Sequence, residues 1–405
     1  MIAGTSQRLP RWVPRLALAA GALLAALGLL TGLTRMGWNI PLPHRARLTV
    51  EHGPLLVVGF FLTLIGLERA VVVGRRFMLL GPVAALASTV GLVLAAPSLA
   101  VDSLLLLAYL GFAATFGYLL WVARTAHHTV MFAGALAWLA SGLLWTKGFS
   151  LPTIVPWWIT GFVLIITGER LELARALRPD RPTRIWFFTA ITLLLVATEI
   201  ELAFPEFGAR LRGVALLLLA AWLLRCDAAR RGLRQHGVHR YSAVCLLHGY
   251  AWLAVGGLLA LAYGHQQSGF LYDAEIHAVL LGFVFSQVFA HAPIILPAVA
   301  GLRLAFRRFA YGAPLALGLS LAVRLAGDLL ADSELRRLGG LGNALSLALF
   351  AVTTVLATLL AQRDVSPDRS ISARLALQSA GAGGEQGGND DARLSRRPVM
   401  DGRWP

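Results

Sequence analysis

Apolar runs of bilayer-spanning length recur along the whole chain, and they constrain its fold more than any other feature. A membrane helix needs roughly 20 apolar residues to cross the hydrocarbon core, and within lipid only helices and closed barrels satisfy every backbone group. Only 14% of the 405 residues are charged, against about a quarter in soluble proteins. The sequence therefore predicts an all-α, polytopic transmembrane bundle of about 12 helices, at residues 14–33, 52–73, 77–96, 103–123, 129–146, 153–169, 185–200, 209–225, 242–263, 276–299, 311–329 and 339–361.

The gaps between these runs differ in their content of Lys and Arg. If the N-terminus is inside the cell, the gaps on that side hold 17 basic residues and the opposite gaps hold 8. Because basic residues favour the cytoplasmic side, we expect a multi-pass protein of the cell inner membrane with both termini in the cytoplasm. The net charge of +15 then reflects membrane topology, so the lipid bilayer is the expected partner and nucleic acid is not.

Two domains are predicted from the change in composition near residue 363. Residues 1–363 form the transmembrane helical domain, whose first run is too long and lacks a small-residue cleavage site for a signal peptide. Residues 364–405 contain the stretch "SAGAGGEQGGNDDARLSRRP". This polar, Gly-rich composition buries too little apolar surface to fold, so we expect a disordered cytoplasmic tail.

A weak internal repeat links spans two, six and ten. The segment "GFFLTLIGLER" begins at Gly59, "GFVLIITGER" at Gly161 and "GFVFSQVF" at Gly282. The spacing indicates a pseudo-threefold repeat of four helices. Gly-Phe pairs are common in membrane helices, so chance similarity is the alternative.

Four histidines fall inside or at the entrance of the predicted spans: His52, His248, His277 and His291. The predicted directions of the helices place His52 and His277 at matching depth near the outer side, and His248 and His291 at matching depth near the inner side. His277 and His291 are 14 residues apart, which puts them on nearly the same helix face about 21 Å apart. His44, His236 and His239 fall in loops and are expected at the surface, and His127 and His128 at the membrane boundary.

Ionisable groups inside the hydrocarbon are costly and mark candidate functional sites. Neutral imidazole is a suitable ligand for haem iron or copper, and Glu51, Tyr272, Asp273 and Glu275 lie near His52 or His277 in the sequence. The alternatives are contact with headgroup water for His52 and His277, and interhelical hydrogen bonds for His248 and His291.

Other polar residues have structural and functional interpretations too. The Glu-Arg pairs that end spans two and six, at Glu68 and Glu169, either are solvated or grip a neighbouring helix or a haem propionate. Arg324 and Asp328 lie one turn apart and either form a local ion pair or line a polar path. Cys226 and Cys245 form no CxxC motif. The sequence has no P-loop and no CxxCH motif, so ATP hydrolysis and covalent haem attachment are not expected.

The segments "EHGPLLVVGFFL" and "IHAVLLGFVF" each place a histidine at the start of a Gly- and Phe-rich span. With twelve spans and a four-helix pseudo-repeat, this pattern resembles the haem–copper oxidase subunit I fold and, more closely, the NnrS-type membrane proteins. The resemblance implies haem b and copper as cofactors, His52, His248, His277 and His291 as their ligands, and a membrane or periplasmic redox partner. It also implies a redox role related to nitric oxide or denitrification.

The chain departs from the oxidases in several ways. Span six carries no histidine, and the pair His127–His128 precedes span five. Span ten lacks a His-x-His motif, which puts oxidase-type turnover at a binuclear centre in doubt. The sequence leaves it open whether the protein is an enzyme. A secondary transporter with proton-relaying histidines, or a structural subunit of a respiratory complex, would share these features.

Overall fold

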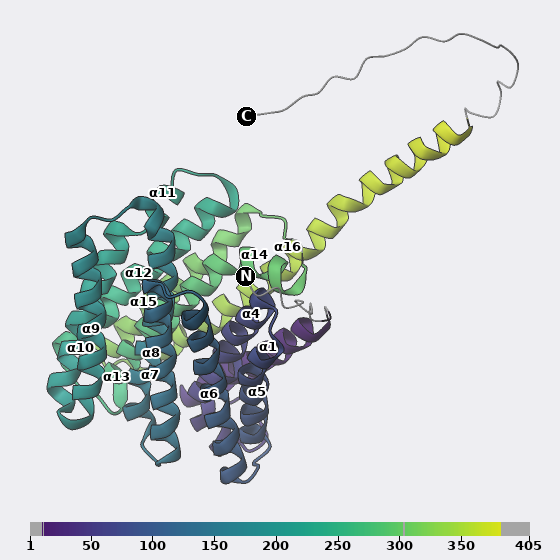
Figure 1. The fold of residues 1–405 in the computed structure, drawn as a ribbon. Coiled ribbons are helices and arrows are strands. Elements are labelled where there is room, and N and C mark those ends of the chain that lie inside the picture. The colour runs from purple at the N-terminus through teal and green to yellow at the C-terminus, as the bar shows by residue number, and fades with distance from the viewer. Residues whose placement is uncertain (1–9, 11, 303, 382–405) are drawn as a thin grey trace, which may run out of the picture. The chain divides into compact units, whose positions relative to one another are not determined.

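The computed structural model describes residue 10, residues 12–302 and residues 304–381, and the regular structure within them is entirely helical (Figure 1). Twelve helices in this part of the chain are long and apolar enough to cross a membrane. The predicted all-α polytopic bundle is therefore confirmed. Several helices extend beyond the apolar runs: α12 begins at Gly237 and α13 at Gly269, because a helix continues into polar residues at the edge of the bilayer.

The spans follow one another along the chain with short connections. They are α1 (Trp12–Arg35), Arg45–Val73 with α2 to α4, Arg76–Val93 with α5, α6 (Ser98–Val122), α7 (Ala126–Thr146), α8 (Leu151–Ala174), α9 (Arg181–Ala203), α10 (Pro205–Cys226), α12 (Gly237–Tyr263), Gly269–Ala300 with α13, η5 and α14, Arg308–Leu329 with α15, and Ser333–Gln362 within α16.

Local sequence explains where several helices begin and end. Asp180 caps α9, since its carboxylate accepts a hydrogen bond from the backbone N–H of Thr183 at 3.0 Å, and Pro182 occupies the first turn. Hydrogen bonds from the side chain and the backbone N–H of Thr183 lower the pKa of Asp180, which lies outside the membrane-spanning segments. The helix α4 (Thr63–Val73) ends at Gly74, whose φ of 71° is a left-handed conformation that glycine adopts without strain.

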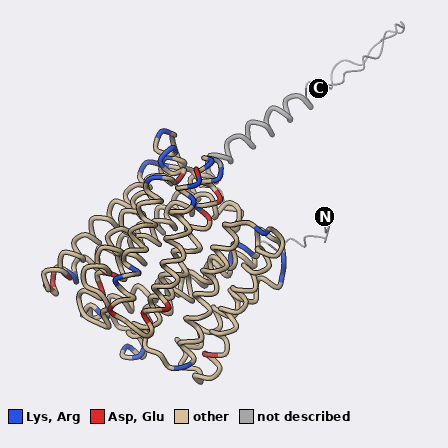
Figure 2. The backbone as a smooth tube through the Cα atoms, turned by 60° about the vertical axis from the view of Figure 1, so that its left-hand side comes forward, with Lys and Arg blue, Asp and Glu red and all other residues tan. Residues whose placement is uncertain are grey.

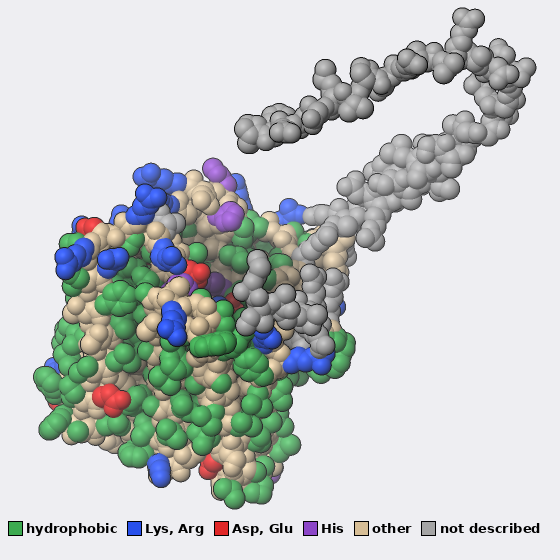
Figure 3. Space-filling view, in the orientation of Figure 1, with side chains coloured by type: hydrophobic (Ala, Val, Ile, Leu, Met, Phe, Trp, Pro, Cys, Tyr) green, Lys and Arg blue, Asp and Glu red, His purple; other side chains and the backbone are tan. Residues whose placement is uncertain are grey.

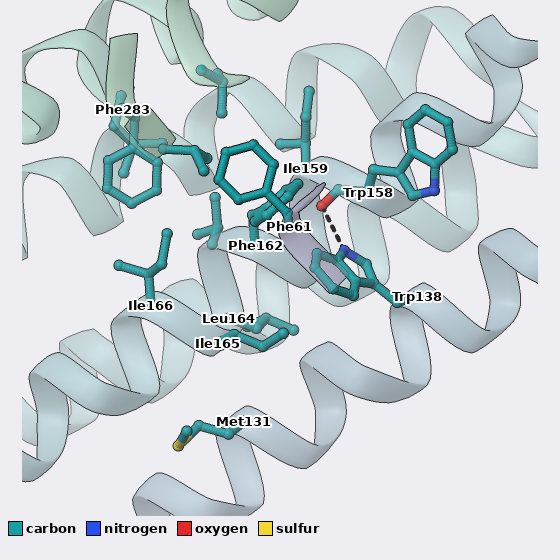
Figure 4. Close-up of a cluster of buried hydrophobic side chains, with 14 of the residues drawn as sticks. Phe61, Met131, Trp138, Trp158, Ile159, Phe162, Leu164, Ile165, Ile166 and Phe283 are labelled. Carbon is teal, nitrogen blue, oxygen red and sulfur yellow. Dashed lines mark hydrogen bonds between the residues drawn. The ribbon is translucent and has the colours of Figure 1, made fainter. Parts of the chain in front are cut away.

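Helix α8 lies at the centre of the packing. In its most apolar stretch, 83% of the residues are buried. The indole of Trp138 on α7 donates to the carbonyl of Trp158 at 3.0 Å, and Phe162 packs edge-on against both Phe61 and Trp138 (Figure 4). A Cβ added to Gly161 would lie 2.0 Å from Cδ1 of Trp138, so the contact between α7 and α8 requires glycine there.

Spans two and ten share a departure from α-helical geometry. A π-helix, η2 (Leu55–Leu62), begins three residues after His52, and a second, η5 (Ala278–Val284), begins directly after His277. The corresponding part of α8 in span six is regular α-helix. Because π-segments often occur at functional sites, the structure relates spans two and ten more closely to each other than to span six. The threefold repeat stays a prediction.

Charge is concentrated at one end of the bundle. Figure 2 shows Lys and Arg gathered at the end that carries α11 (Ala229–Gly232). The gaps 124–128, 170–184 and 225–241 meet there, and we call it the basic end. The imbalance counted in the sequence is thus a spatial asymmetry of the fold.

The C-terminal part differs from the prediction. Within the described residues, the chain divides into two compact units at residue 358. Helix α16 runs from Ser333 to Gly381, so residues 364–381, which we expected to be disordered, are helical. Extending an existing helix avoids the cost of nucleation. The rest of the predicted tail lies outside the described residues.

Candidate functional site

The structure brings His52 and His277 together from spans two and ten. Their ring centroids lie 6.2 Å apart, and their planes are inclined by 23°. His52 follows a short 3₁₀ turn, η1 (Thr49–Glu51), at the start of its span, and His277 ends α13 (Gly269–His277). The residues 225 positions apart in the sequence therefore share one site, which we call the histidine pair.

Both rings are held in the same way. Nδ1 of His52 donates to the carbonyl of Gly28 at 2.6 Å, and Nδ1 of His277 donates to the carbonyl of Asp273 at 2.8 Å. A carbonyl can only accept a hydrogen bond, so the proton of each neutral ring lies on Nδ1. The lone pair of each ring is then on Nε2, the atom that would ligate a metal.

The ring of His52 packs closely against α1. A Cβ added to Gly32 would lie 2.7 Å from Cε1 and Nδ1 of this ring. Glycine at this position lets the imidazole approach the helix backbone, where it reaches the Gly28 carbonyl one turn earlier. Gly28 and Gly32 therefore hold the His52 ring against α1, Gly28 through its carbonyl and Gly32 by leaving space for the imidazole.

Buried charges surround His277. Asp273 accepts hydrogen bonds from Nε and one terminal nitrogen of Arg324 at 2.8 and 2.9 Å, and Arg336 lies 2.9 Å from the same carboxylate. Arg324 also donates to Nε2 of His277 at 3.2 Å. Asp328 pairs with Arg336 at 3.1 Å, so Arg324 and Asp328 each find a partner on another helix rather than each other. We call these five residues the outer network.

Glu275, two residues before His277 in the sequence, pairs with another side chain. Glu275 is buried and accepts a hydrogen bond from Arg212 at 2.6 Å, and Arg212 also pairs with Glu201 at 2.8 Å. Residues two apart on a helix point in different directions, which separates Glu275 from the His277 ring. The sequence pattern did not predict this triad, although charged residues at the edges of apolar runs indicate that buried ion pairs are needed there.

His248 is fully engaged by protein partners. Trp252 donates its indole N–H to Nε2 of His248 at 3.0 Å, and Nδ1 of His248 donates to the Ser286 hydroxyl at 2.9 Å. That hydroxyl donates to the carbonyl of Gly282 at 2.6 Å. His248 thus forms an interhelical hydrogen bond between α12 and span ten, the alternative that the sequence left open.

His291 stands apart from His248. Its Nδ1 donates to the carbonyl of Gln287 at 2.8 Å, one turn earlier in α14 (Phe285–Ala300). His248 meets span ten at Ser286 instead, and no hydrogen bond or ring contact joins the two histidines in the described part of the chain. The predicted inner pair is therefore not formed, because Ser286 and Trp252 already bind both nitrogens of His248.

The repeated Glu-Arg pairs join neighbouring helices. Arg69, at the end of span two, forms an ion pair with Glu169, at the end of span six. Arg170 reaches Asp227 after α10 at 2.8 and 3.3 Å, and both side chains are buried. The Glu-Arg sequence pairs therefore supply ion pairs that join neighbouring helices. His44, His236 and His239 are exposed as expected, and of the adjacent pair His127 is buried while His128 is half-buried. His265 lies 3.2 Å from the carboxylate of Glu201.

One family model matches this chain, and its description is a domain of unknown function, DUF8744. The match covers residues 13–359, which include the histidine pair, the outer network and nearly all of the twelve spans. The chain belongs to the DUF8744 family. No curated protein matches the DUF8744 chain.

The histidines and carboxylates of this DUF8744 protein are arranged in a way that suits haem iron better than a copper ion with three or four protein ligands. Among the described residues, no three or more His, Cys, Asp and Glu side chains come together to hold a metal ion, so a three- or four-ligand copper site is not formed there. The histidine pair offers two imidazole nitrogens, the number that a six-coordinate haem iron takes from protein. The space beside His277 is too small to hold a water molecule, whereas small-molecule sites typically measure about 300–1,000 Å³, so a haem would fit there only after the surrounding helices move apart.

Proposed function

We propose that this DUF8744 protein is an integral membrane haem protein in which His52 and His277 would hold one haem b. The observation that carries the proposal is the separation of 6.2 Å between the two ring centroids. Two metal–nitrogen bonds of about 2.0 Å, together with half of each imidazole ring, span about the same distance when both rings meet the metal edge-on. The two rings are stacked in this structure, so they have to turn before both Nε2 atoms can reach one iron. The proposed ligand set is narrower than the four histidines of the sequence prediction.

The hydrogen bonds of the pair support this assignment. A histidine ligand usually donates its second ring N–H to a backbone carbonyl or carboxylate, which fixes the tautomer and the ring orientation. Gly28 and Asp273 provide such carbonyls. A bound haem would supply one-electron chemistry at its iron. The chain's own contribution is to orient the two imidazoles and to surround them with apolar helices.

Haem binding requires a local change at Arg324. Its guanidinium contacts Nε2 of His277 at 3.2 Å, and it has to leave that nitrogen before a metal can bind there. Arg324 lies on α15 (Gly312–Leu329), which packs closely against its neighbours at Gly318 and Gly327, so haem binding would have to offset a loss of packing at this helix. Arg324 and Arg336 are also the cations suited to the propionate carboxylates of a haem.

The role follows from the proposed cofactor and from the resemblance to NnrS-type proteins. We propose redox sensing, electron transfer or defence against reactive nitrogen species, with a membrane or periplasmic redox partner. We also propose the cell inner membrane as the location, with the basic end in the cytoplasm. The histidine pair then lies toward the opposite side of the membrane.

The spectrum of the purified protein tests the proposal. We expect a Soret band and about one iron per chain in detergent-purified protein from cells supplied with haem precursors. His52→Ala and His277→Ala should each remove or strongly shift the band, whereas His248→Ala should keep it. Copper is measured in the same samples, since the pair could hold copper in two-coordinate form. Protein without haem, whether or not it contains copper, or a band that survives both substitutions, would overturn the assignment.

A secondary transporter is the second candidate, and one observation favours it. Asp328 is buried, and neither of its carboxylate oxygens makes a hydrogen bond within the described structure, although Arg336 is at ion-pair distance. Buried ionisable groups in membrane helices often mark ion pathways. If this candidate is correct, pigment-free protein in liposomes will show pH-dependent transport that Asp328→Asn abolishes.

A further inference from the structure

A second site lies at the basic end of the bundle. Its lining residues, 124–196, lie between His52 and His277 in the sequence. A groove of about 1180 Å³ opens between the start of α7, the end of α8 with the 3₁₀ turn η4 (Arg175–Leu177), and α9. Helices α7 and α8 pack closely through Gly134 and Gly168, so one wall of the groove is formed by tightly packed helices. Its opposite side is the exposed face of α9.

Five arginines line this groove: Arg124, Arg175, Arg178, Arg181 and Arg184. All five are exposed, and none forms an ion pair with a carboxylate among the described residues. The nearest acidic residue in sequence, Asp180, is engaged by the backbone N–H of Thr183. Glu172 also lies nearby, 3.9 Å from Nε2 of His127 in the groove lining. Five arginines against these two carboxylates leave the groove with a net positive charge.

The backbone contributes to this arrangement. Arg178 has a φ of 49°, a left-handed conformation that is unfavourable for residues with a Cβ. It closes the turn that follows η4, and Pro179 and Asp180 then lead directly into α9. The turn brings arginines from both sides of it, such as Arg175 and Arg181, to the same groove.

The other wall of the groove is apolar. Ile185, Phe188 and Val196 on α9 line it and are 55%, 38% and 45% exposed, and Leu193 lies between them. From Arg184 to Val196 the helix advances about 18 Å, away from the basic end and into the depth expected for acyl chains. Figure 3 shows the same arrangement over the visible face, with basic side chains at the top and hydrophobic ones below.

We propose that this groove binds an anionic phospholipid, whose phosphate lies among the five arginines and whose acyl chain lies along α9. Basic pockets between membrane helices on the cytoplasmic side suit phospholipid head groups. Charge alone would suit any anion. The exposed apolar wall beside the charges favours a lipid over free phosphate, because a soluble anion gains nothing from Phe188 and Val196.

Lipid retention by the full-length protein tests this proposal. The protein is purified in detergent, mixed with phosphatidylglycerol or phosphatidylcholine, and its bound lipid is measured by native mass spectrometry. We expect phosphatidylglycerol to be retained about tenfold more than phosphatidylcholine. The variant R175Q/R178Q/R181Q/R184Q should lose this preference, and the milder R181Q/R184Q should weaken it. Monodispersity and the thermal unfolding midpoint show that each variant is folded.

A matched variant separates the groove from the basic end as a whole. R230Q/R231Q/R234Q/R240Q removes the same number of exposed arginines from the same end, outside the groove. It should retain phosphatidylglycerol as the native protein does, whereas Phe188→Asn should reduce retention with all arginines present. Equal losses in the two arginine variants, displacement of the lipid by millimolar inorganic phosphate, or no effect of Phe188→Asn would overturn the proposal.

Discussion

Trp252 donates its indole N–H to Nε2 of His248 over 3.0 Å, and this bond occupies the nitrogen that would ligate a metal, as Arg324 does at Nε2 of His277 over 3.2 Å. His248 joins α12 to span ten through Ser286, and its role is structural. The candidate redox centre is reduced to the histidine pair.

His248→Ala should destabilise the protein without altering a cofactor. The substitution leaves the Trp252 indole and the Ser286 hydroxyl with one partner fewer, and hydrogen bonds between membrane helices contribute about 0.6–2 kcal/mol. We expect the free energy of unfolding to fall by about 1–2 kcal/mol in a denaturant titration. His239→Ala, at an exposed position, is the control. Loss of the haem absorption band with an unchanged free energy of unfolding would contradict the structural role of His248.

Gly32→Ala should disturb His52 without removing it. A Cβ at this position would lie 2.7 Å from the His52 ring, so the imidazole must rotate or move away from α1. If His52 ligates haem, the absorption maxima and the reduction potential will shift. Gly21→Ala is the control on the same helix, since its Cβ would meet only atoms at 3.7 Å or more. Identical spectra for the two variants would count against His52 as a ligand.

Gly161→Ala should destabilise the centre of the bundle. The added Cβ would overlap the Trp138 indole, which donates to the Trp158 carbonyl and cannot withdraw without losing that hydrogen bond. Overpacking of this kind costs about 1–3 kcal/mol. The measurement is thermal unfolding in detergent. Gly312→Ala, where the nearest atom is 3.7 Å away, should change the midpoint little.

Removing one partner of the buried pair Arg170–Asp227 should lower the free energy of unfolding more than removing both. Asp227→Asn leaves a buried guanidinium without its counter-ion, for which a loss of about 3–5 kcal/mol is typical. The double variant R170M/D227N should recover part of that loss. Glu334→Gln breaks an exposed pair with Arg337 and should cost less than about 1 kcal/mol. Equal effects at the two sites would show that the buried pair is not special.

Membrane orientation can be read by cysteine labelling. In a C226S/C245A background, Gln235→Cys lies at the basic end and Gln267→Cys at the opposite end, both exposed. We expect an impermeant maleimide to label position 267 in intact cells and position 235 only after permeabilisation. The reverse pattern would place the basic end outside and invert the proposed topology.

Much of the site was within reach of the sequence, but its partners were not. The matching depth of His52 and His277 follows from counting residues along two spans, and their contact in the structure agrees with it. The same counting placed His248 beside His291, because depth does not say which way a side chain points. Ser286 and Trp252 bind His248 because α12 is rotated about its axis so that this face meets span ten. The pattern of apolar residues does not indicate that rotation.

The sequence by itself determined the membrane environment, the all-α class and the number of spans, since a bilayer imposes a fixed length and composition on each crossing helix. It also placed the basic residues at alternate gaps, and so at one end of the bundle. Only the tertiary structure decided which charges pair: Arg324 with Asp273, Arg170 with Asp227 and Arg212 with two glutamates. These pairs join different helices, and they depend on how the helices rotate and cross, which is set by side-chain packing over the whole bundle.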